Sequence, residues 1–504
     1  MRQRQEIQKV LRRKLIPIGI IAFWLIMMGL LFKNEYDRRQ VTPISHVGTV
    51  VPMDTWMGIF TKGSDGAESQ LGYLRTQSIP QQVDGDVGVE YHLTLKLATQ
   101  ILSFPTEIFL DGTTWISQKN GLQRLAFTVD SFGEHVMKAS GQSVDGQFKL
   151  DIETAGETFP MTVPLRENMM VSGGLGTTSL HIPSLEIGDE VIVPTFDPLT
   201  FSYSQYAMIR CVGSDTFNFD GQEIPVKVLE TDVNGITSTS WVTFDNEVVY
   251  VDTPFGFHLR KVLPHEALDT SKPSGSVDLL NAVAIRPTGL TPFRGATRMR
   301  FRLSGLPAVA EPPGDENQVA FSKLQYETTA PEFEIAQGTT PLPDSQRYLT
   351  GDAFVQIDHP VITDLRDEII SSDASDLENA RAIYEWLWNN IEKKPVLSFP
   401  SALDVAKTRE GDCNEHTVLF AALSRAAGIP TRMAIGVVWS SALNGFYYHA
   451  WPEIYTDHWI PMDPTLGQPI ADATHIKFLE GNMDAWPKLI AYLGQVQIEV
   501  LEIE

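Results

Sequence analysis

The chain has 504 residues and a net charge of −24, with 39 Lys and Arg against 63 Asp and Glu. A single hydrophobic core rarely extends beyond about 250–300 residues, so this length predicts two or three folded units. The acidic balance argues against a nucleic-acid partner, because recognition of the phosphate backbone requires a basic surface.

The start of the chain is basic and apolar. An uncharged run of 18 residues extends from Leu15 to Phe32, and as a helix it would span roughly 27 Å, enough for a bilayer core. Six Lys and Arg precede it against one acid, Glu6. This bias predicts a cytoplasmic tail over residues 1–14, a single-pass helix over 15–32 in the cytoplasmic membrane, and a periplasmic or extracellular bulk. A cleaved signal peptide is the alternative, but the run is long and no small-residue cleavage site follows it.

Residues 51–270 alternate apolar and polar side chains, as in the run Glu90–Leu97. Asp-Gly or Asn-Gly pairs begin at positions 111, 145, 220 and 234, and such pairs between alternating runs are typical of β-hairpins. We therefore expect an antiparallel β domain, of the curved-sheet or half-barrel type. It contains no cluster of His, Cys or acids at metal-ligand spacing, and we expect neither a metal nor a cofactor.

Residues 271–345 contain one clear strand, Thr297–Leu303, and a Pro-Pro-Gly loop at 312–314. This pattern predicts a small β unit or a connector.

Helical periodicity begins in residues 350–504. Ser375 and Glu378 have the spacing of a capping box. Six apolar residues then follow at helical intervals and predict one buried face: Ala380, Ile383, Tyr384, Leu387, Trp388 and Ile391.

A second helix is predicted to begin at Cys413. Asp412 and Glu415 again have capping-box spacing, and Gly428 ends the apolar stripe. The free backbone N–H groups of a first helical turn favour a thiolate, so we expect a lowered pKa for Cys413. The same N–H groups can face a substrate oxyanion. The other cysteine, Cys211, lies in a strand-like apolar run and is predicted to be a core residue rather than a disulfide partner.

His449 and Asp463 are predicted to meet across a hairpin. If its turn centres on Thr456, His449 lies directly opposite Asp463, with Cβ atoms about 4.5–5.5 Å apart. A shift of the turn by one residue would remove this pairing. Cys413 would then be the nucleophile, His449 its base and Asp463 the carboxylate that orients the imidazole. His416, one helical turn from Cys413, is the competing base.

Four segments in this region resemble motifs of the transglutaminase-like superfamily, whose fold and active site are similar to those of papain-like proteases. They are Gly411–Cys413, Gly428–Arg432, His449–Glu453 and Trp459–Thr465. The resemblance covers about a quarter of the chain and also fits bacterial members over Leu466–His475. It implies an α+β fold in which a cysteine helix packs on an antiparallel sheet that carries His449 and Asp463.

Three functions remain open. The first is acyl transfer from amide substrates through a thioester on Cys413, with an amine or water as the acceptor. The second is a cysteine peptidase or amidase that only hydrolyses envelope peptides. The third is a binding or assembly module that keeps the fold without turnover. Expected partners are a protein or peptide substrate and the membrane.

Overall fold

The computed structural model describes residues 52–504 except for short gaps at 63–67, 84, 102–103, 132–133, 155–156, 166–169, 172–184, 198–201, 234–235, 254–256, 270–283, 307–310, 323, 332–341, 343, 395–400, 482–491 and 493–495. The predicted transmembrane helix at residues 15–32 therefore lies outside the described residues. Within them, no helix has both the length and the apolar character needed to cross a membrane.

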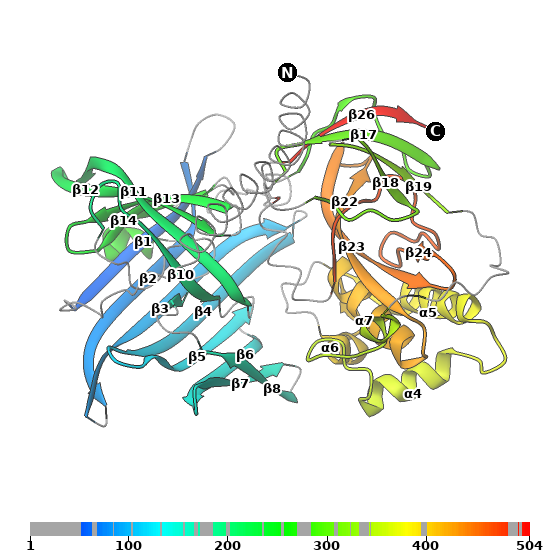
Figure 1. The fold of residues 1–504 in the computed structure, drawn as a ribbon, viewed down its shortest axis with the longest axis horizontal. Helices are drawn as coiled ribbons and strands as arrows, with labels where there is room; N and C mark the ends of the chain where they lie inside the picture. Colours follow the sequence, from blue (N-terminus) through cyan, green and yellow to red (C-terminus); the bar gives the residue numbers. More distant parts are fainter. Residues whose placement is uncertain are drawn as a thin grey trace, which may run out of the picture.

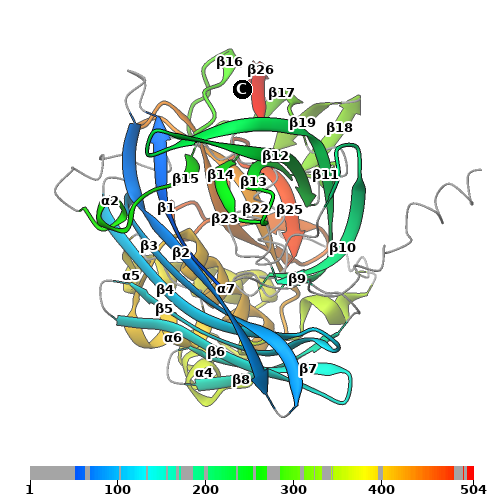
Figure 2. The ribbon, with the colours of Figure 1, turned by 90° about the vertical axis from the view of Figure 1, so that its left-hand side faces the viewer.

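One sheet of fifteen strands occupies the N-terminal half of the chain, in the order β8-β7-β6-β5-β4-β3-β2-β1-β15-β14-β13-β12-β11-β10-β9. Neighbouring strands are antiparallel except for β9 and β10, which run parallel. The sheet curls strongly (Figures 1 and 2), and the β-rich character predicted from the sequence is confirmed. The strands are β1 (Met53–Lys62), β2 (Glu68–Val83), β3 (Asp86–Ile101), β4 (Phe104–Ser117), β5 (Gly121–Ser131), β6 (Glu134–Val144), β7 (Gln147–Thr154), β8 (Glu157–Pro164), β9 (Met170–Val171), β10 (Glu190–Asp197), β11 (Ser202–Phe219), β12 (Gln222–Val233), β13 (Ile236–Thr243), β14 (Val248–Asp252) and β15 (Phe257–Lys261).

Two of the predicted Asp-Gly turns form as expected. Asp145 and Asp220 both have positive φ angles, of 51° and 50°, and each joins two adjacent strands of the sheet. The pair at 111 does not form a turn, because Asp111 and Gly112 lie inside β4. A Cβ atom at Gly112 would lie 3.1 Å from Cβ of Phe127 on β5, a tight contact that a larger residue would have to relieve by a small shift.

Cys211 lies on β11 and is completely buried in a small apolar cluster with Ile209 and Leu229. Both cysteines of the chain are free. The predicted core role of Cys211 is therefore confirmed.

A second sheet has the order β16-β26-β17-β19-β18. Its strands are β16 (Thr288–Gly289), β17 (Arg298–Ser304), β18 (Gln318–Ser322), β19 (Gln325–Thr329) and the C-terminal β26 (Gln497–Ile503). The C-terminal strand is thus inserted between two strands from the region that the sequence predicted as a small unit or connector. Phe301 and Val500 of this sheet share a core with Phe446 of the neighbouring sheet.

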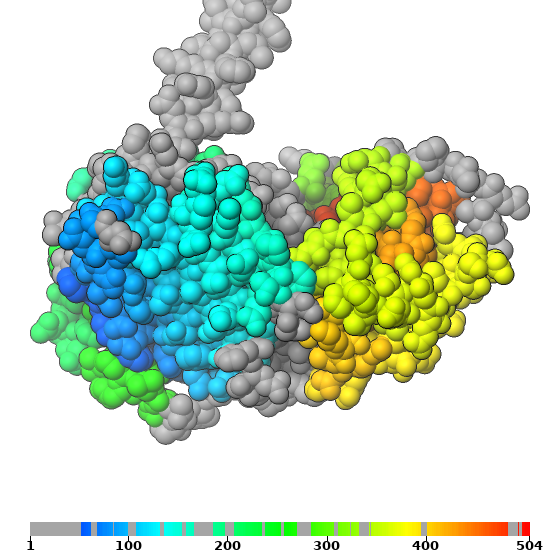
Figure 3. All heavy atoms as spheres, turned by 90° about the horizontal axis from the view of Figure 1, so that it is seen from below, coloured from blue at the N-terminus to red at the C-terminus, as the bar shows by residue number. Residues whose placement is uncertain are grey.

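The third part of the fold is built around α7 (Cys413–Ala426), a helix with eleven of its 14 residues buried. A four-stranded sheet, in the order β24-β23-β22-β25, consists of β22 (Thr431–Ser440), β23 (Gly445–Tyr455), β24 (Trp459–Pro461) and β25 (Ile476–Gly481). The helices are α4 (Pro360–Ile369), α5 (Asp376–Asn390), α6 (Ala402–Thr408) and α7 (Cys413–Ala426), with a two-stranded ladder of β20 (Glu392–Lys393) and β21 (Glu410–Gly411). Two short helices, α2 (Pro264–Ala267) and η1 (Ser345–Tyr348), lie earlier in the chain. The sheet-rich and helical parts lie side by side (Figure 3).

Helix α5 begins with the predicted capping box, because Ser375 caps Glu378 and the Glu378 carboxylate accepts from the Ser375 amide at 2.8 Å. Five of the six residues predicted for its buried face are buried. Trp388 is the exception: its side chain is 41% exposed. The prediction for Trp388 was wrong: its ring lies under Lys393 and beside Gly467 and stays partly open to solvent.

Candidate functional site

Cys413 is the first residue of α7, and its position is fixed by the cap that precedes it. Asp412 Oδ1 accepts from the Asn414 amide at 2.9 Å, and Glu415 Oε2 accepts from the Asp412 amide at 2.9 Å. The predicted capping box is therefore confirmed. Gly411 is required beside it, because a Cβ atom at this position would lie 2.2 Å from Cβ of Glu415. The Gly-Asp-Cys sequence thus places the thiol at the start of the helix through contacts between neighbouring residues.

The pKa of the Cys413 thiol is raised, contrary to the prediction. Burial raises this pKa well above its usual range, and the carboxylates of Asp412 and Glu415 add to the effect. The Ala450 backbone amide acts in the opposite direction as a hydrogen-bond donor. The acids that cap the helix offset the positive end of its dipole, which favours the thiol over the thiolate.

His449 and Asp463 form a buried hydrogen-bonded pair. His449 lies on β23, which packs against α7, and its Nε2 is 2.8 Å from Asp463 Oδ2. The two residues are 7% and 0% exposed. The predicted proximity of the two side chains is therefore confirmed.

The predicted register of the hairpin was wrong. The observed pairs are Tyr455 with Trp459 and Glu453 with Pro461, so the turn centres on Asp457 rather than Thr456. With that register His449 would face residue 465, but the ladder ends at Pro461, whose carbonyl accepts from the Ala471 amide. Asp463 reaches His449 because the chain leaves the ladder there and turns back on itself.

The loop that follows β24 holds Asp463 rigidly. Its Oδ1 accepts from the backbone amides of Thr465 and Leu466, each at 2.9 Å. Its backbone exchanges two hydrogen bonds with Gln468, at 2.8 and 2.9 Å. Burial raises the pKa of Asp463, but the charges and hydrogen bonds of His449 and His475 outweigh burial and lower it overall. Asp463 is therefore ionised and fixed in place.

His475 also contacts Asp463, and the sequence did not single it out as a site residue. Its Nε2 lies 3.0 Å from Asp463 Oδ2, and its Nδ1 lies 3.0 Å from the Asp472 carbonyl oxygen and 3.5 Å from Asp472 Oδ1. Burial lowers the pKa of His475, but hydrogen bonds to Asp463 and Asp472 outweigh it and raise the pKa to about 9. The contact joins residues twelve positions apart across a loop, so no periodic pattern could have predicted it.

His449, Asp463 and His475 are also the three described residues whose ligand atoms come within 4.8 Å of one another, and could in principle hold a metal ion. Their donor atoms, however, already face each other at hydrogen-bonding distances of 2.8 and 3.0 Å. Distances of this size match protons shared with a carboxylate. The arrangement therefore fits a hydrogen-bonded His–Asp–His set.

His416, the competing base, has a different environment. Its Nδ1 lies 2.7 Å from the Asp412 carbonyl oxygen, so a backbone group rather than a carboxylate orients its ring. Burial lowers the pKa of His416. The side chain is fully buried and lacks an orienting carboxylate such as Asp463, which favours His449 as the base.

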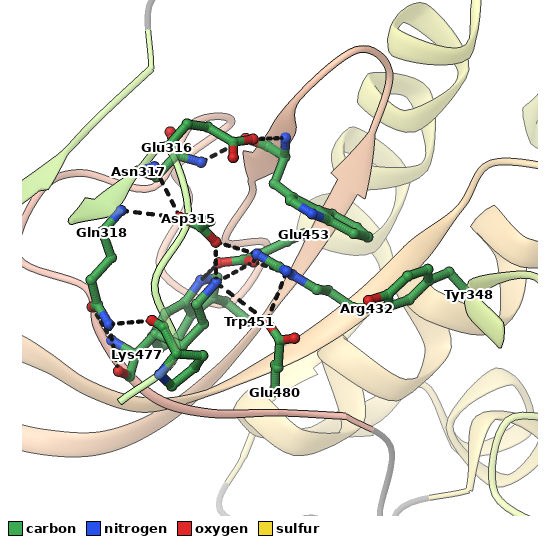
Figure 4. Close-up of polar contacts among 12 residues, drawn as sticks. Asp315, Glu316, Asn317, Gln318, Tyr348, Arg432, Trp451, Glu453, Lys477 and Glu480 are labelled. Atoms are coloured by element: carbon green, nitrogen blue, oxygen red, sulfur yellow. Dashed lines mark hydrogen bonds and ion pairs between the residues drawn. The ribbon is translucent and has the colours of Figure 1, made fainter. Parts of the chain in front are cut away.

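The remaining charged residues of the motifs form a separate buried network (Figure 4). Arg432 on β22 lies opposite Glu453 on β23, and its Nε donates to Glu453 Oε2 at 2.6 Å. Lys477 on β25 donates to the same oxygen at 2.9 Å and to Asp315 at 2.5 Å. Arg432 also pairs with Asp315 and with Glu480. These residues join three strands of the sheet to the loop before β18, so their role is structural.

Comparisons with known proteins agree with this geometry. Residues 363–464 match the family model of the transglutaminase-like superfamily. Kyphoscoliosis peptidase of Mus musculus is 27% identical over 131 residues, which are 23% of this chain and 20% of that protein. An uncharacterized protein of Haemophilus influenzae is 29% identical over 99 residues, 19% of this chain and 27% of that protein. The chain thus spans less than a third of the length of either relative.

Two solved structures were also found. A candidate cysteine protease of Cytophaga hutchinsonii is 19% identical and covers 44% of this chain and 85% of its own, with a TM-score of 0.28. A beta-barrel-like protein of Brucella abortus is 9% identical and covers 42% of this chain and 95% of its own, with a TM-score of 0.30.

The chain carries a transglutaminase-like domain, and the range that matches the family model contains Cys413, His449 and Asp463.

Proposed function

We propose that this chain is a thiol-dependent enzyme that acts on amide substrates through an acyl-thioester on Cys413. The observation that carries the proposal is the buried pair of His449 and Asp463, in which His449 lies on a strand packed against the helix that begins with Cys413. A nucleophile, a base and a group that orients the base are the minimum set for acyl transfer of this kind.

The hydrogen bond between His449 and Asp463 determines how the imidazole would act. An ionised carboxylate only accepts hydrogen bonds, so the proton of neutral His449 resides on Nε2. Nδ1 is then the atom that takes the thiol proton as Sγ attacks the substrate carbonyl carbon. The resulting imidazolium donates this proton to the departing amine when the C–N bond breaks, which leaves an acyl-thioester. Attack by an amine or a water molecule releases the acyl group and returns the proton to sulfur.

The raised pKa of Cys413 makes the base essential in this scheme. A resting thiol is a poor nucleophile, and it becomes reactive only as His449 removes its proton. Backbone N–H groups in the first turn of α7 are the donors that would stabilise the oxyanion. The charged side chain of His475 would keep Asp463 ionised and aligned throughout.

The acceptor distinguishes the possible reactions. An amine acceptor gives transamidation, and water gives hydrolysis of a peptide or side-chain amide. A non-catalytic binding or assembly module is the competing function, and the raised pKa of Cys413 is the observation that favours it.

We further propose that residues 15–32 anchor the enzyme in the cytoplasmic membrane with its bulk outside, so that envelope peptides or proteins are its substrates.

Trapping of the thioester tests the proposal without knowledge of the natural acceptor. The full chain is incubated with N,N-dimethylcasein and hydroxylamine, and hydroxamate formation is measured. Cys413→Ala is expected to abolish the product and His449→Ala to lower its rate by about 1000-fold or more. Cys211→Ala is the matched control, because it removes the other cysteine away from the site.

A second measurement covers the case in which casein is not a substrate. The rate of Cys413 alkylation by iodoacetamide is followed in the wild type and in His449→Ala. Loss of rate on removing His449 supports the base role. An unchanged rate, together with no hydroxamate, would overturn the enzymatic proposal in favour of the binding module.

A further inference from the structure

We propose that Lys393 and Arg294, together with the exposed ring of Trp388, form a subsite that binds a carboxylate of the substrate beside Cys413. This inference rests on the proposed function and deepens it, because it assigns the class of substrate: peptides with an acidic group close to the reacting amide. None of these residues is needed for the acyl-transfer chemistry itself.

The backbone places Lys393 next to the nucleophile. Lys393 on β20 pairs with Gly411 on β21, and Gly411 is two residues before Cys413. The Lys394 amide donates to the Gly411 carbonyl at 3.1 Å and extends the ladder. The charge of Asp463 raises the pKa of Lys393, and the charge of Lys393 adds to burial in lowering the pKa of His416. Lys393 is therefore at the site and not on a remote surface.

Trp388 connects Lys393 to the loop that carries Asp463. Lys393 Nζ lies 3.2 Å from the centroid of the Trp388 ring. The same ring packs against Gly467, where a Cβ atom would lie 2.5 Å from it. Trp388 remains 41% exposed in spite of these contacts. An exposed aromatic face with a cation held over it can support a bound peptide while the cation pairs with an anion.

Arg294 contacts the same loop. Its Nη2 donates to the Leu466 carbonyl at 2.9 Å, and the next amide, of Gly295, donates to Asp472 at 2.8 Å. Burial and the nearby charge of Arg294 lower the pKa of Lys393, and Asp463 opposes them. Arg294 and the Trp388 ring therefore contact adjacent residues of one loop, Leu466 and Gly467.

Neither cation forms an ion pair within the described part of the chain. Asp463 raises the pKa of Lys393, but the Asp463 carboxylate makes its own hydrogen bonds with His449 and His475. The adjacent Lys394, in contrast, pairs with Glu410 at 2.5 Å. Two unpaired cations that converge on the site of a chain with a net charge of −24 suggest that their counter-ion comes with the ligand. The Trp388 ring fixes where Lys393 lies and the Leu466 carbonyl fixes where Arg294 lies, but neither contact supplies a negative charge.

Two alkylating reagents of the same size test the subsite without a substrate. Iodoacetate carries the carboxylate and iodoacetamide is neutral. The iodoacetate rate at Cys413 is divided by the iodoacetamide rate, and this ratio is compared with the same ratio for free N-acetylcysteine. The comparison reports the electrostatic field at the thiol. In the full chain, Lys393→Gln and Arg294→Gln are each expected to lower this ratio by about threefold, the effect of one charge at about 7 Å in water. Lys393→Glu should lower it further.

Lys394→Gln is the matched control, because it removes the same charge from the adjacent residue, which has its own carboxylate partner. Its ratio should stay close to the wild-type value. Equal ratios in the wild type, Lys393→Gln and Arg294→Gln would overturn the subsite. The iodoacetamide rate alone tests the competence of Cys413, so a failure of the proposed function is separately visible.

Ligand binding gives a second readout that does not depend on thiol reactivity. Four peptides are titrated into the Cys413→Ala full chain by ligand-observed NMR: acetyl-Gln-Glu, acetyl-Gln-Glu-amide, acetyl-Gln-Gln and acetyl-Gln-Gln-amide. Tighter binding of acetyl-Gln-Glu-amide than of acetyl-Gln-Gln-amide, lost in a Lys393→Gln background, indicates a side-chain carboxylate. Preference for acetyl-Gln-Gln over its amide indicates a terminal carboxylate. Equal affinity for all four peptides would overturn the proposal.

Discussion

His475 Nε2 lies 3.0 Å from Asp463 Oδ2, the same oxygen that His449 Nε2 meets at 2.8 Å. One carboxylate oxygen thus serves two imidazoles. Only His449 lies on the strand packed against α7. His475 is therefore a positioning residue, which acts through Asp463.

The His475→Gln substitution tests this role. Glutamine can keep one hydrogen bond to Asp463 but removes the positive charge, so we expect kcat to fall by about 10- to 100-fold with little change in KM. The fall in kcat should be larger in His475→Ala than in His475→Gln. A purely structural role would instead lower the folded fraction and leave the kcat of the remaining folded enzyme and its pH profile unchanged.

The buried charge of His475 also predicts a pH dependence of stability. Its pKa rises from 6.5 to about 9 on folding, so its contribution is fully present below pH 6.5 and is lost as pH rises towards 9. Urea unfolding of the wild type and His475→Gln at pH 6 and pH 9.5 measures the difference. We expect the difference in unfolding free energy to shrink by up to about 3 kcal/mol at the higher pH. A constant difference would contradict a charged His475.

The space beside the helix cap predicts the effect of Gly411→Ala. The added Cβ would lie 2.2 Å from Cβ of Glu415, so the capping box must open and Cys413 must move. We expect a loss of about 1–3 kcal/mol in unfolding free energy together with a loss of thioester formation. Gly213→Ala is the matched control, because nothing lies within 4 Å of the added atom. A Gly411→Ala protein with wild-type stability and activity would show that the cap does not position the thiol.

The network of Arg432, Glu453, Lys477 and Asp315 predicts a large stability effect without a direct effect on chemistry. Glu453 is 3% exposed and accepts from both cations, so Glu453→Gln leaves buried charge unpaired. We expect a loss of about 3–5 kcal/mol in unfolding free energy, measured by urea denaturation. Glu190→Gln, which breaks an exposed pair with Arg210, should remain close to the wild type. Similar losses in both variants would contradict the structural role of the network.

Short-range sequence patterns predicted the starts of the helices correctly. The capping boxes at Ser375 and Asp412 formed as predicted, because each depends on contacts between residues three positions apart. Cys413, His449 and Asp463 could be selected because their residue types and the segments around them resemble known motifs. The pairing of His449 with Asp463 was confirmed, but by a loop and not by the strand register that predicted it.

Contacts between distant segments were decided only by the tertiary structure. The upward pKa of Cys413, the exposure of Trp388 and the contact of His475 with Asp463 all depend on which segments pack together. The same holds for Trp388 and Arg294, which are 94 positions apart in the sequence and contact adjacent residues of one loop, Gly467 and Leu466. The sequence by itself determined which chemical groups are present and how each helix begins. Packing decided how deeply these groups are buried and which residues surround them. Burial and neighbours in turn set the charge of each group, because the energy of a charged group depends on the water and the partners around it.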